Sequence, residues 1–286
     1  MKNLFISVLI FVIIGFIVVQ NSLTFKIKKL IKNKDCIVGV SVISENRMWN
    51  IGNQKQPLLS VFKILVALKV LENESINLNT KLKIDKSMLS KNTYSPMLKK
   101  FNSVPFEISI KELLEYMISQ SDNNACDILL DYSGGIAELE KYIHSIGFPD
   151  IELFVTEKEM NIDIEKQYLN KAYNKDIARL IKNAHEGKIL SKDRTDFFNE
   201  IMIKTSTGEN KLKAALPQDA VIGHKTGSSS RNNKGERIAD NDAGFIILKN
   251  GKSYYISVML TDSKMSDDMN AKLIKDISSI VYNYIN

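Results

Sequence analysis

The chain has 286 residues, 44% hydrophobic and 25% charged, so it can bury a full core and has the composition of a globular protein. Its net charge of +6 comes from lysines scattered along the whole chain, with acidic residues between them. A nucleic-acid-binding protein more often concentrates its basic residues in one stripe. We therefore expect no nucleic-acid partner.

The N-terminal region carries a targeting signal. Lys2 precedes an apolar run over residues 4–19. A helix over this run would be about 24 Å long, shorter than a bilayer core of about 30 Å. The length favours a secretory signal peptide over an uncleaved anchor. Two features oppose this interpretation: lysines follow the apolar run, and no small-x-small cleavage site follows it. We expect residues 1–30 to be this segment, the protein to be exported (periplasmic or secreted), and any membrane contact to be through this segment alone.

Hydrophobic periodicity predicts strands near both ends of the chain and helices between them. The predicted strands are residues 36–43, 220–224, 244–248 and 254–260, and the predicted helices are residues 58–71, 110–119, 125–132, 136–146, 176–186 and 267–282. Asn250-Gly251 is a hairpin signal between the last two strands. Residues 147–174 have poor periodicity and are predicted to form a long loop.

This order of elements predicts an α+β fold. An antiparallel sheet would be built from both ends of the chain and flanked by helices, with an inserted all-helical lobe. One folded domain is expected over residues 31–286, with its α/β lobe at 31–56 and 204–286 and its helical lobe at 57–203. The two cysteines, Cys36 and Cys126, lie in apolar runs, which favours buried free thiols over a disulfide. No HExxH or CxxC motif occurs, so we expect neither a metal site nor another cofactor.

Ser60 and Lys63 form an S-x-x-K motif at the start of a predicted helix. They would lie one turn apart on the same face, and Pro57 just upstream suits a helix start. A serine hydroxyl is a weak nucleophile that needs a base within reach, and Lys63 could be that base if its apolar neighbours lower its pKa. The free N–H groups of a first turn favour developing negative charge. Alone, the motif is common enough to arise by chance.

Two further motifs follow in order. Ser121-Asp122-Asn123 reads S-D-N; it can cap the next helix, and it can also aim Ser121 and Asn123 into a cleft, for proton transfer and for holding a substrate amide. Lys225-Thr226-Gly227 reads K-T-G on a predicted strand, where a lysine and a hydroxyl suit a carboxylate and the glycine allows close approach of a ligand. A lysine on a sheet edge that discourages aggregation is the alternative. The three motifs together are far more specific than any one.

These motifs make the chain resemble a class A serine β-lactamase from about residue 33 to its end. Tyr94-Ser95-Pro96 is similar to the family's cleft-wall tyrosine segment, and Glu157 to Asn161 is similar to its E-x-x-L-N loop, with Met160 for the leucine. The resemblance implies that Glu157 activates the hydrolytic water, that Asn161 helps to hold it, and that the backbone N–H groups of Ser60 and Ser228 form the oxyanion hole. Glu159 is a nearby rival, but its spacing does not fit.

The resemblance also has gaps. The family's loop arginine and its aspartate partner correspond here to Val155 and Asn170, so the loop must be held in another way. The arginine that binds the substrate carboxylate has no clear match, although Arg231 and Arg237 are candidates. Residues 121–129 and 156–170 are more similar to the divergent second subclass, which includes extended-spectrum and cephalosporin-hydrolysing enzymes.

We therefore predict a monomeric enzyme that hydrolyses small-molecule β-lactams through a serine acyl-enzyme. The predicted catalytic residues are Ser60, Lys63, Ser121 and Glu157, and the predicted substrate-binding residues are Tyr94, Asn123, Asn161, Lys225, Thr226, Gly227 and Ser228. A penicillin-binding D,D-peptidase would share the nucleophile but stay acylated by β-lactams. A non-catalytic relative that binds peptidoglycan or a β-lactam is the other alternative.

Overall fold

A computed structural model describes residues 22–101 and 103–286 of the chain. The apolar run at residues 4–19, with the targeting segment predicted on it, lies outside the described residues. Among the residues described, no helix is both long enough and apolar enough to cross a membrane.

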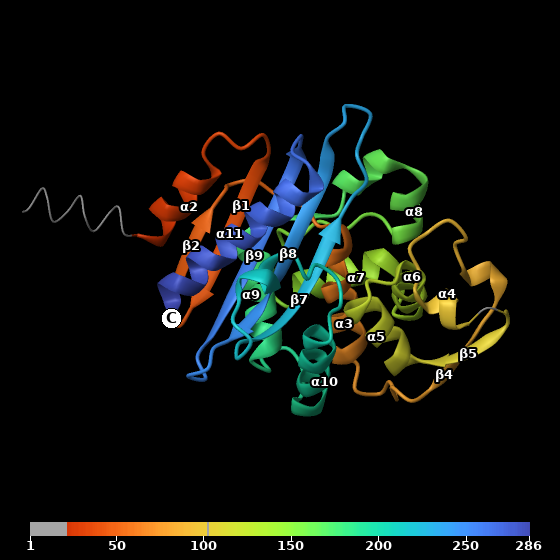
Figure 1. Cartoon of the computed structure of the whole chain (residues 1–286). Helices are drawn as coiled ribbons and strands as arrows, with labels where there is room; N and C mark the ends of the chain where they lie inside the picture. The colour runs from red at the N-terminus through yellow and green to blue at the C-terminus, as the bar shows by residue number, and fades with distance from the viewer. Residues whose placement is uncertain (1–21, 102) are drawn as a thin grey trace, which may run out of the picture.

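A five-stranded antiparallel sheet runs through the molecule in the order β2-β1-β9-β8-β7 (Figure 1). Its strands are β1 (Ile37–Ser44), β2 (Arg47–Ile51), β7 (Val221–Ser228), β8 (Arg237–Ile247) and β9 (Ser253–Ser263). The first two strands and the last three come from opposite ends of the chain, as predicted. The β8–β9 hairpin turns at Asn250-Gly251, where Gly251 has a φ of 80° that a residue with a side chain rarely adopts.

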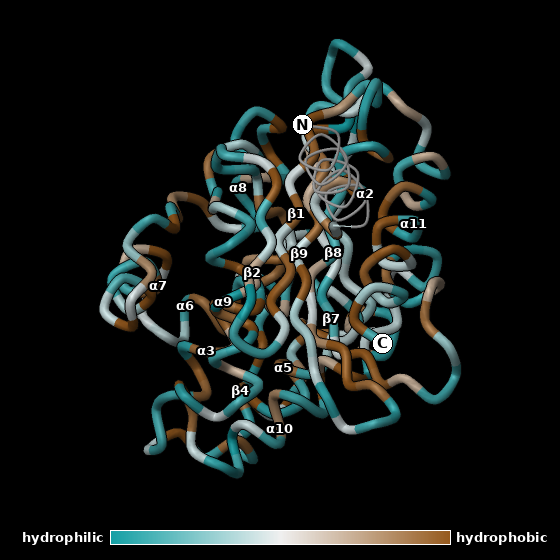
Figure 2. Tube along the Cα trace, turned by 90° about the vertical axis from the view of Figure 1, so that its left-hand side faces the viewer, coloured by the Kyte–Doolittle hydropathy of each residue, from teal (hydrophilic) through white to brown (hydrophobic). Residues whose placement is uncertain are grey.

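The two faces of the sheet pack against different helices because side chains alternate along each strand. On β9, Ile256 and Val258 belong to a core with α2 (Leu23–Ile31) and α11 (Asp267–Ile285). Tyr255 and Met259 belong to the larger core, which includes the remaining long helices. Figure 2 shows α2 and α11 on one side of the strands and α6, α7 and α9 on the other.

Most of the helices between β3 and β7 form a lobe beside β7, while α9 packs on the face of the sheet against β1 and β9 (Figure 1). The helices between these two strands are α3 (Lys63–Glu72), α4 (Met97–Lys100), α5 (Ile110–Ser119), α6 (Asn123–Tyr132), α7 (Gly135–Ser145), α8 (Glu157–Ile162), α9 (Asn174–His185) and α10 (Lys192–Ile203), with 3₁₀ turns η1 (Leu59–Phe62), η2 (Lys86–Met88), η3 (Ile164–Tyr168) and η4 (Leu212–Ala215). Two short antiparallel pairs complete the structure, β3 (Gln56–Pro57) with β6 (Lys171–Ala172) and β4 (Lys81–Ile84) with β5 (Phe106–Ser109). The predicted α+β fold class is confirmed.

Several local predictions need correction. The segment predicted as one helix over residues 58–71 is a 3₁₀ turn followed by α3. The predicted loop at 147–174 contains helix α8, which begins with a capping box between Thr156 and Glu159. Helix α2 begins inside the predicted N-terminal segment, and its Leu23 and Ile27 are fully buried against the sheet and α11. The folded part therefore begins by residue 22, before the boundary expected at residue 31.

Candidate active site

Ser60 lies in the tight turn η1, immediately before α3. The preceding residue, Leu59, has a φ of 45°, a left-handed conformation that is strained for leucine and is typical of functional sites. The turn is fixed from β8, because Asn241 Nδ2 donates to Pro57 O at 2.8 Å and to Leu58 O at 3.1 Å. Ser60 is thus held at the head of a buried helix with its side chain lining the main pocket.

Gly227 allows β7 to lie directly against this turn. A Cβ at Gly227 would be 2.6 Å from Leu58 O and 3.2 Å from Ser60 N, too close for any side chain. The sequence predicted close approach by a ligand, whereas the atoms that need the space belong to the protein's own backbone. The contact brings the neighbouring residue of the strand, Ser228, to the cleft beside Ser60.

Lys63 is completely buried and contacts every other predicted catalytic side chain. Its Nζ lies 3.0 Å from Ser60 Oγ and 3.0 Å from Glu157 Oε1. It also donates to Ser121 O at 2.8 Å and to Asn123 Oδ1 at 2.6 Å. A buried ammonium is stable only with such partners, so this network holds the charge of Lys63 next to the serine.

Glu157 is the first residue of α8 and is 6% exposed. Ser60 Oγ donates to its Oε1 at 3.2 Å. The carboxylate therefore faces the serine instead of bulk solvent and is within hydrogen-bond reach of both Ser60 and Lys63. Glu159, the rival in the sequence, has its Oε2 hydrogen-bonded to Thr156 N at 2.9 Å and caps the helix.

Ser121 lies between the two active-site lysines. Its Oγ is 3.4 Å from Lys63 Nζ and 2.8 Å from Lys225 Nζ. Its φ of 60° turns the chain before Asp122, which caps α6 through Ala125 N at 2.9 Å. Burial, helped by the charge of Lys63, lowers the pKa of Lys225 well below its usual value. The hydroxyl of Ser121 is thus placed to exchange a proton with either ammonium group.

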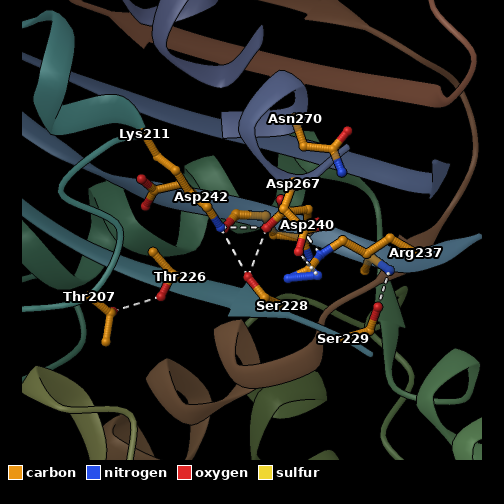
Figure 3. A network of polar contacts seen from close by, with 12 residues as sticks. Thr207, Lys211, Thr226, Ser228, Ser229, Arg237, Asp240, Asp242, Asp267 and Asn270 are labelled. Atoms are coloured by element: carbon orange, nitrogen blue, oxygen red, sulfur yellow. Dashed lines mark hydrogen bonds and ion pairs between the residues drawn. The ribbon is translucent and has the colours of Figure 1, made fainter. Parts of the chain in front are cut away.

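The other predicted substrate-binding residues border the same pocket. Thr226 Oγ1 is 2.7 Å from Thr207 Oγ1 (Figure 3). Tyr94 is 57% exposed on one wall. Asn161 lies on α8 and donates from Nδ2 to Asn92 O at 2.8 Å. Within residues 22–101 and 103–286, no group of three or more His, Cys, Asp or Glu side chains could hold a metal ion.

Asn170 replaces the missing ion-pair clamp of the loop. It is fully buried, accepts from Phe154 N at 2.8 Å and from Val155 N at 3.1 Å, and donates to Val155 O at 2.7 Å. Its own carbonyl accepts from Leu58 N at 2.8 Å, which ties the loop to the segment before Ser60. The uncharged amide of Asn170 therefore holds the loop in place of the ion pair that the sequence lacks.

Removing this amide should loosen the loop under Glu157. Asn170→Ala leaves buried N–H and C=O groups unpaired, so we expect a loss of about 2–3 kcal/mol in the free energy of unfolding and a lower kcat. Urea denaturation and steady-state kinetics measure the two effects. Asn174→Ala, at another buried and hydrogen-bonded asparagine away from α8, should cost stability while keeping kcat. Equal kcat in both variants would contradict the loop-holding role.

Asp127 on α6 is a second tether of α8. Its Oδ1 accepts from Glu157 N at 2.9 Å and its Oδ2 from Lys158 N at 2.8 Å. Burial, together with the charge of Glu157, raises the pKa of Asp127 from 3.8 to about 7, while the two N–H groups oppose the rise. The Asp127 carboxylate on α6 thus fixes the N-terminus of α8, where Glu157 lies.

The raised pKa predicts a pH dependence of stability. The folded state binds the Asp127 proton more tightly than the unfolded state, so this group's contribution to stability is greatest below the unfolded pKa and is lost as pH rises from about 4 to about 7. Asp127→Asn binds no proton. The difference between the free energies of unfolding of the variant and the wild type should change across that window and level off above it. A difference independent of pH would contradict the assignment.

Beyond Ser228 the pocket ends in a group of charged side chains that no motif predicted (Figure 3). Lys211, just before η4, is 6% exposed and its Nζ is 3.0 Å from Ser228 Oγ. Arg237 lines this end of the pocket as well and is paired with Asp267 at 3.1 Å. Arg231, the other sequence candidate for binding the substrate carboxylate, donates instead to Met265 O at 2.9 Å and to Asp267. Lys211 is thus a cation beside the strand that carries the K-T-G motif, and the sequence motifs did not predict it.

The fold and the site define a serine acyl-transfer enzyme. A serine at a helix start, a buried lysine, a second serine hydroxyl and a carboxylate converge on one cleft between the sheet and the helical lobe. The carboxylate lies beside the serine, where a base that activates a water would have to be placed.

Comparisons with known proteins identify the family. Residues 22–285 match the model of the β-lactamase enzyme family. The chain is 42% identical to a β-lactamase of Bacteroides uniformis, covering 99% of both chains, and 36% identical to β-lactamase VEB-1 of Pseudomonas aeruginosa over 92% of this chain and 90% of that one. The crystal structure of the extended-spectrum β-lactamase TLA-1 superposes with a TM-score of 0.90 at 38% identity, covering 93% of this chain and 99% of the other. The chain belongs to the β-lactamase enzyme family and is a class A serine β-lactamase, a hydrolase of β-lactam antibiotics, as predicted.

Proposed function

We propose that Ser60 is the nucleophile that opens the β-lactam ring and that Glu157 drives the release of the acyl group. The observation that carries this assignment is the contact of Ser60 Oγ with both Lys63 Nζ at 3.0 Å and Glu157 Oε1 at 3.2 Å. The nucleophile therefore has a base and a cation within hydrogen-bond distance before substrate enters.

In the acylation step, Ser60 Oγ forms a bond to the lactam carbonyl carbon as its proton leaves. Glu157 can take the proton directly, or Lys63 can take it after giving its own proton to Glu157, since Lys63 Nζ and Glu157 Oε1 are 3.0 Å apart. Ser121 then passes a proton to the lactam nitrogen as the C–N bond breaks, and it regains a proton from Lys63, whose Nζ is 3.4 Å from Ser121 Oγ. Lys63 in turn recovers the proton from Glu157, which leaves Glu157 ionised for the next step. The backbone N–H groups of Ser60 and Ser228 bind the oxyanion.

In the deacylation step, Glu157 takes a proton from a water that attacks the ester carbon of Ser60. The proton returns to Ser60 as the ester bond breaks. Asn161, one turn further along α8, helps to position the water, while Asn170 and Asp127 fix the loop and helix that carry Glu157. An enzyme that stays acylated by β-lactams would not need such a carboxylate.

The substrate is held by the walls of the cleft. Thr226 contacts its carboxylate, Asn123 contacts its amide side chain, and Tyr94 covers one face. Lys225 is completely buried and does not line the cleft, so it steers the carboxylate through its charge from behind Thr226. The preference proposed is for cephalosporins, supported by similarity to the extended-spectrum enzyme TLA-1 named above. We also propose that the enzyme is exported, since the predicted targeting segment precedes the folded domain, and that it acts as a monomer, since a single chain supplies the residues that line the cleft.

The test is mass spectrometry of the purified wild-type protein with a chromogenic cephalosporin. We expect hydrolysis and, in samples quenched within one turnover, an adduct of the ring-opened mass on the peptide that contains Ser60. An adduct on another residue would overturn the assignment of the nucleophile. Mass measurement of the protein from the culture also tells whether residues 1–30 have been removed.

A further inference from the structure

Lys211, Ser228 and Asp240 form a closed set of contacts at the end of the pocket (Figure 3). Lys211 Nζ donates to Ser228 Oγ at 3.0 Å and forms an ion pair with Asp240 Oδ1. Ser228 Oγ donates its only proton to the same Oδ1 at 2.7 Å. Asp240 is 2% exposed and is opposite Ser228 in the β7–β8 pair, so the carboxylate is built into the sheet.

These contacts occupy two of the donors that an anionic substrate group could reach, Ser228 and Lys211, and leave it only Thr226 and the charge of Lys225. A carboxylate that approaches Thr226 and Ser228 requires a free hydroxyl donor or an unbalanced positive charge. The hydroxyl proton of Ser228 is already given to Asp240, and the charge of Lys211 is already balanced by it. Asp240 therefore behaves as an internal anion at this end of the cleft.

Arg237 offers Asp240 a second partner. Arg237 Nε is buried and has no hydrogen-bond partner among the residues the structure describes, and it lies 3.8 Å from Asp240 Oδ2. A small rotation of the Asp240 carboxylate toward Arg237 would pair this nitrogen and release Ser228 and Lys211. The Asp240 carboxylate can thus be paired in two positions. In one it occupies Ser228 and Lys211, and in the other it pairs with Arg237 and leaves those two donors free.

We propose that Asp240 is a specificity-determining residue that competes with the substrate's carboxylate for Lys211 and Ser228, and that it turns to Arg237 when an anionic β-lactam binds. The proposal rests on the proposed function of the cleft. Selectivity is a difference between affinities, and a like charge in a subsite lowers the affinity for one class of ligand. The wild-type enzyme should therefore have only a slightly higher kcat/KM for carboxylate-bearing β-lactams than for uncharged ones.

The test compares a chromogenic cephalosporin with its methyl ester, which has the same ring but no charge. In Asp240→Asn the ratio of kcat/KM for the acid to that for the ester should rise about tenfold, through a lower KM for the acid and an unchanged kcat. Asp240→Glu, which keeps the charge, should stay near the wild-type ratio. Asp176→Asn is the matched control, a buried carboxylate paired with Arg179 at 3.2 Å on α9, outside the pocket.

If Asp240→Asn changes kcat/KM equally for the acid and the ester, or changes neither, their ratio stays the same. That result would overturn the proposal and leave Asp240 with a structural role. If Asp240→Asn does not fold, Asp240→Thr removes the charge with a smaller side chain and is judged by the same ratio. Wild-type protein that hydrolyses neither compound would contradict the proposed function instead.

A double-mutant cycle tests the part assigned to Arg237. Arg237→Gln should raise KM for the acid several-fold in the wild-type background, because Asp240 then has no second partner. In the Asp240→Asn background the same substitution should have no effect on KM. An equal effect in both backgrounds would show that Arg237 binds the substrate directly, and the displacement of Asp240 would be wrong.

Discussion

Ser60→Ala is expected to reduce the kcat for a chromogenic cephalosporin by about 10⁶-fold, the scale of losing a serine nucleophile. The alanine keeps the turn and the helix but removes the atom that Lys63 and Glu157 contact at 3.0 and 3.2 Å. No adduct should form at any time after mixing, because the hydroxyl that would carry the acyl group is absent. The measurement is steady-state turnover together with intact-protein mass spectrometry.

The control for this variant must show that the cleft is intact. Ser206→Ala removes a hydroxyl that donates to Ser119 O outside the cleft, and it should keep the wild-type kcat. Both variants should unfold at similar temperatures. Hydrolysis that survives in folded Ser60→Ala would refute the covalent mechanism, since water would then be attacking the lactam without an acyl-enzyme.

The strands and most helices could be predicted because their apolar positions repeat with the period of the element. The strand predicted over residues 254–260 lies within β9, and helix α5 has the predicted bounds, with the capping box of Ser109 and Glu112 at its start. Helix α8 was missed because its six residues are too few for a periodicity signal. Its capping box, Thr156 with Glu159, was present in the sequence and would have indicated the start of the helix.

The candidate catalytic residues that meet at the cleft could be found from short motifs, but the residues that support them could not. Asn170 and Asp127 act through backbone N–H groups that only the folded loop brings to them. Lys211 and Asp240 are separated in sequence and meet because η4 lies over β8. No spacing rule applies to side chains that meet through tertiary packing, so neither pair carries a sequence signal.

Glu157→Gln is expected to convert the enzyme into a trap for its substrate. The amide keeps the size of the side chain but cannot take a proton from water, so turnover should fall by about 10²–10⁴-fold, the usual contribution of a general base. Acylation should persist, because the buried Lys63 Nζ, 3.0 Å from Ser60 Oγ, no longer has an ion-pair partner at position 157 and can act as the base in place of Glu157. A single burst of one product per enzyme molecule and a stable acyl-enzyme mass are the expected observations.

Glu159→Gln is the matched control on the same helix. It is the rival carboxylate in the sequence, yet its Oε2 faces Thr156 N at 2.9 Å, and a glutamine oxygen can accept the same bond. Its kcat should equal that of the wild type. Loss of turnover in Glu159→Gln with normal turnover in Glu157→Gln would reassign the base. Slow acylation without an accumulated adduct in Glu157→Gln would mean that Glu157 is the base for Ser60 in the acylation step. Lys63 would then be unable to replace Glu157, although Lys63 Nζ contacts the same Ser60 oxygen.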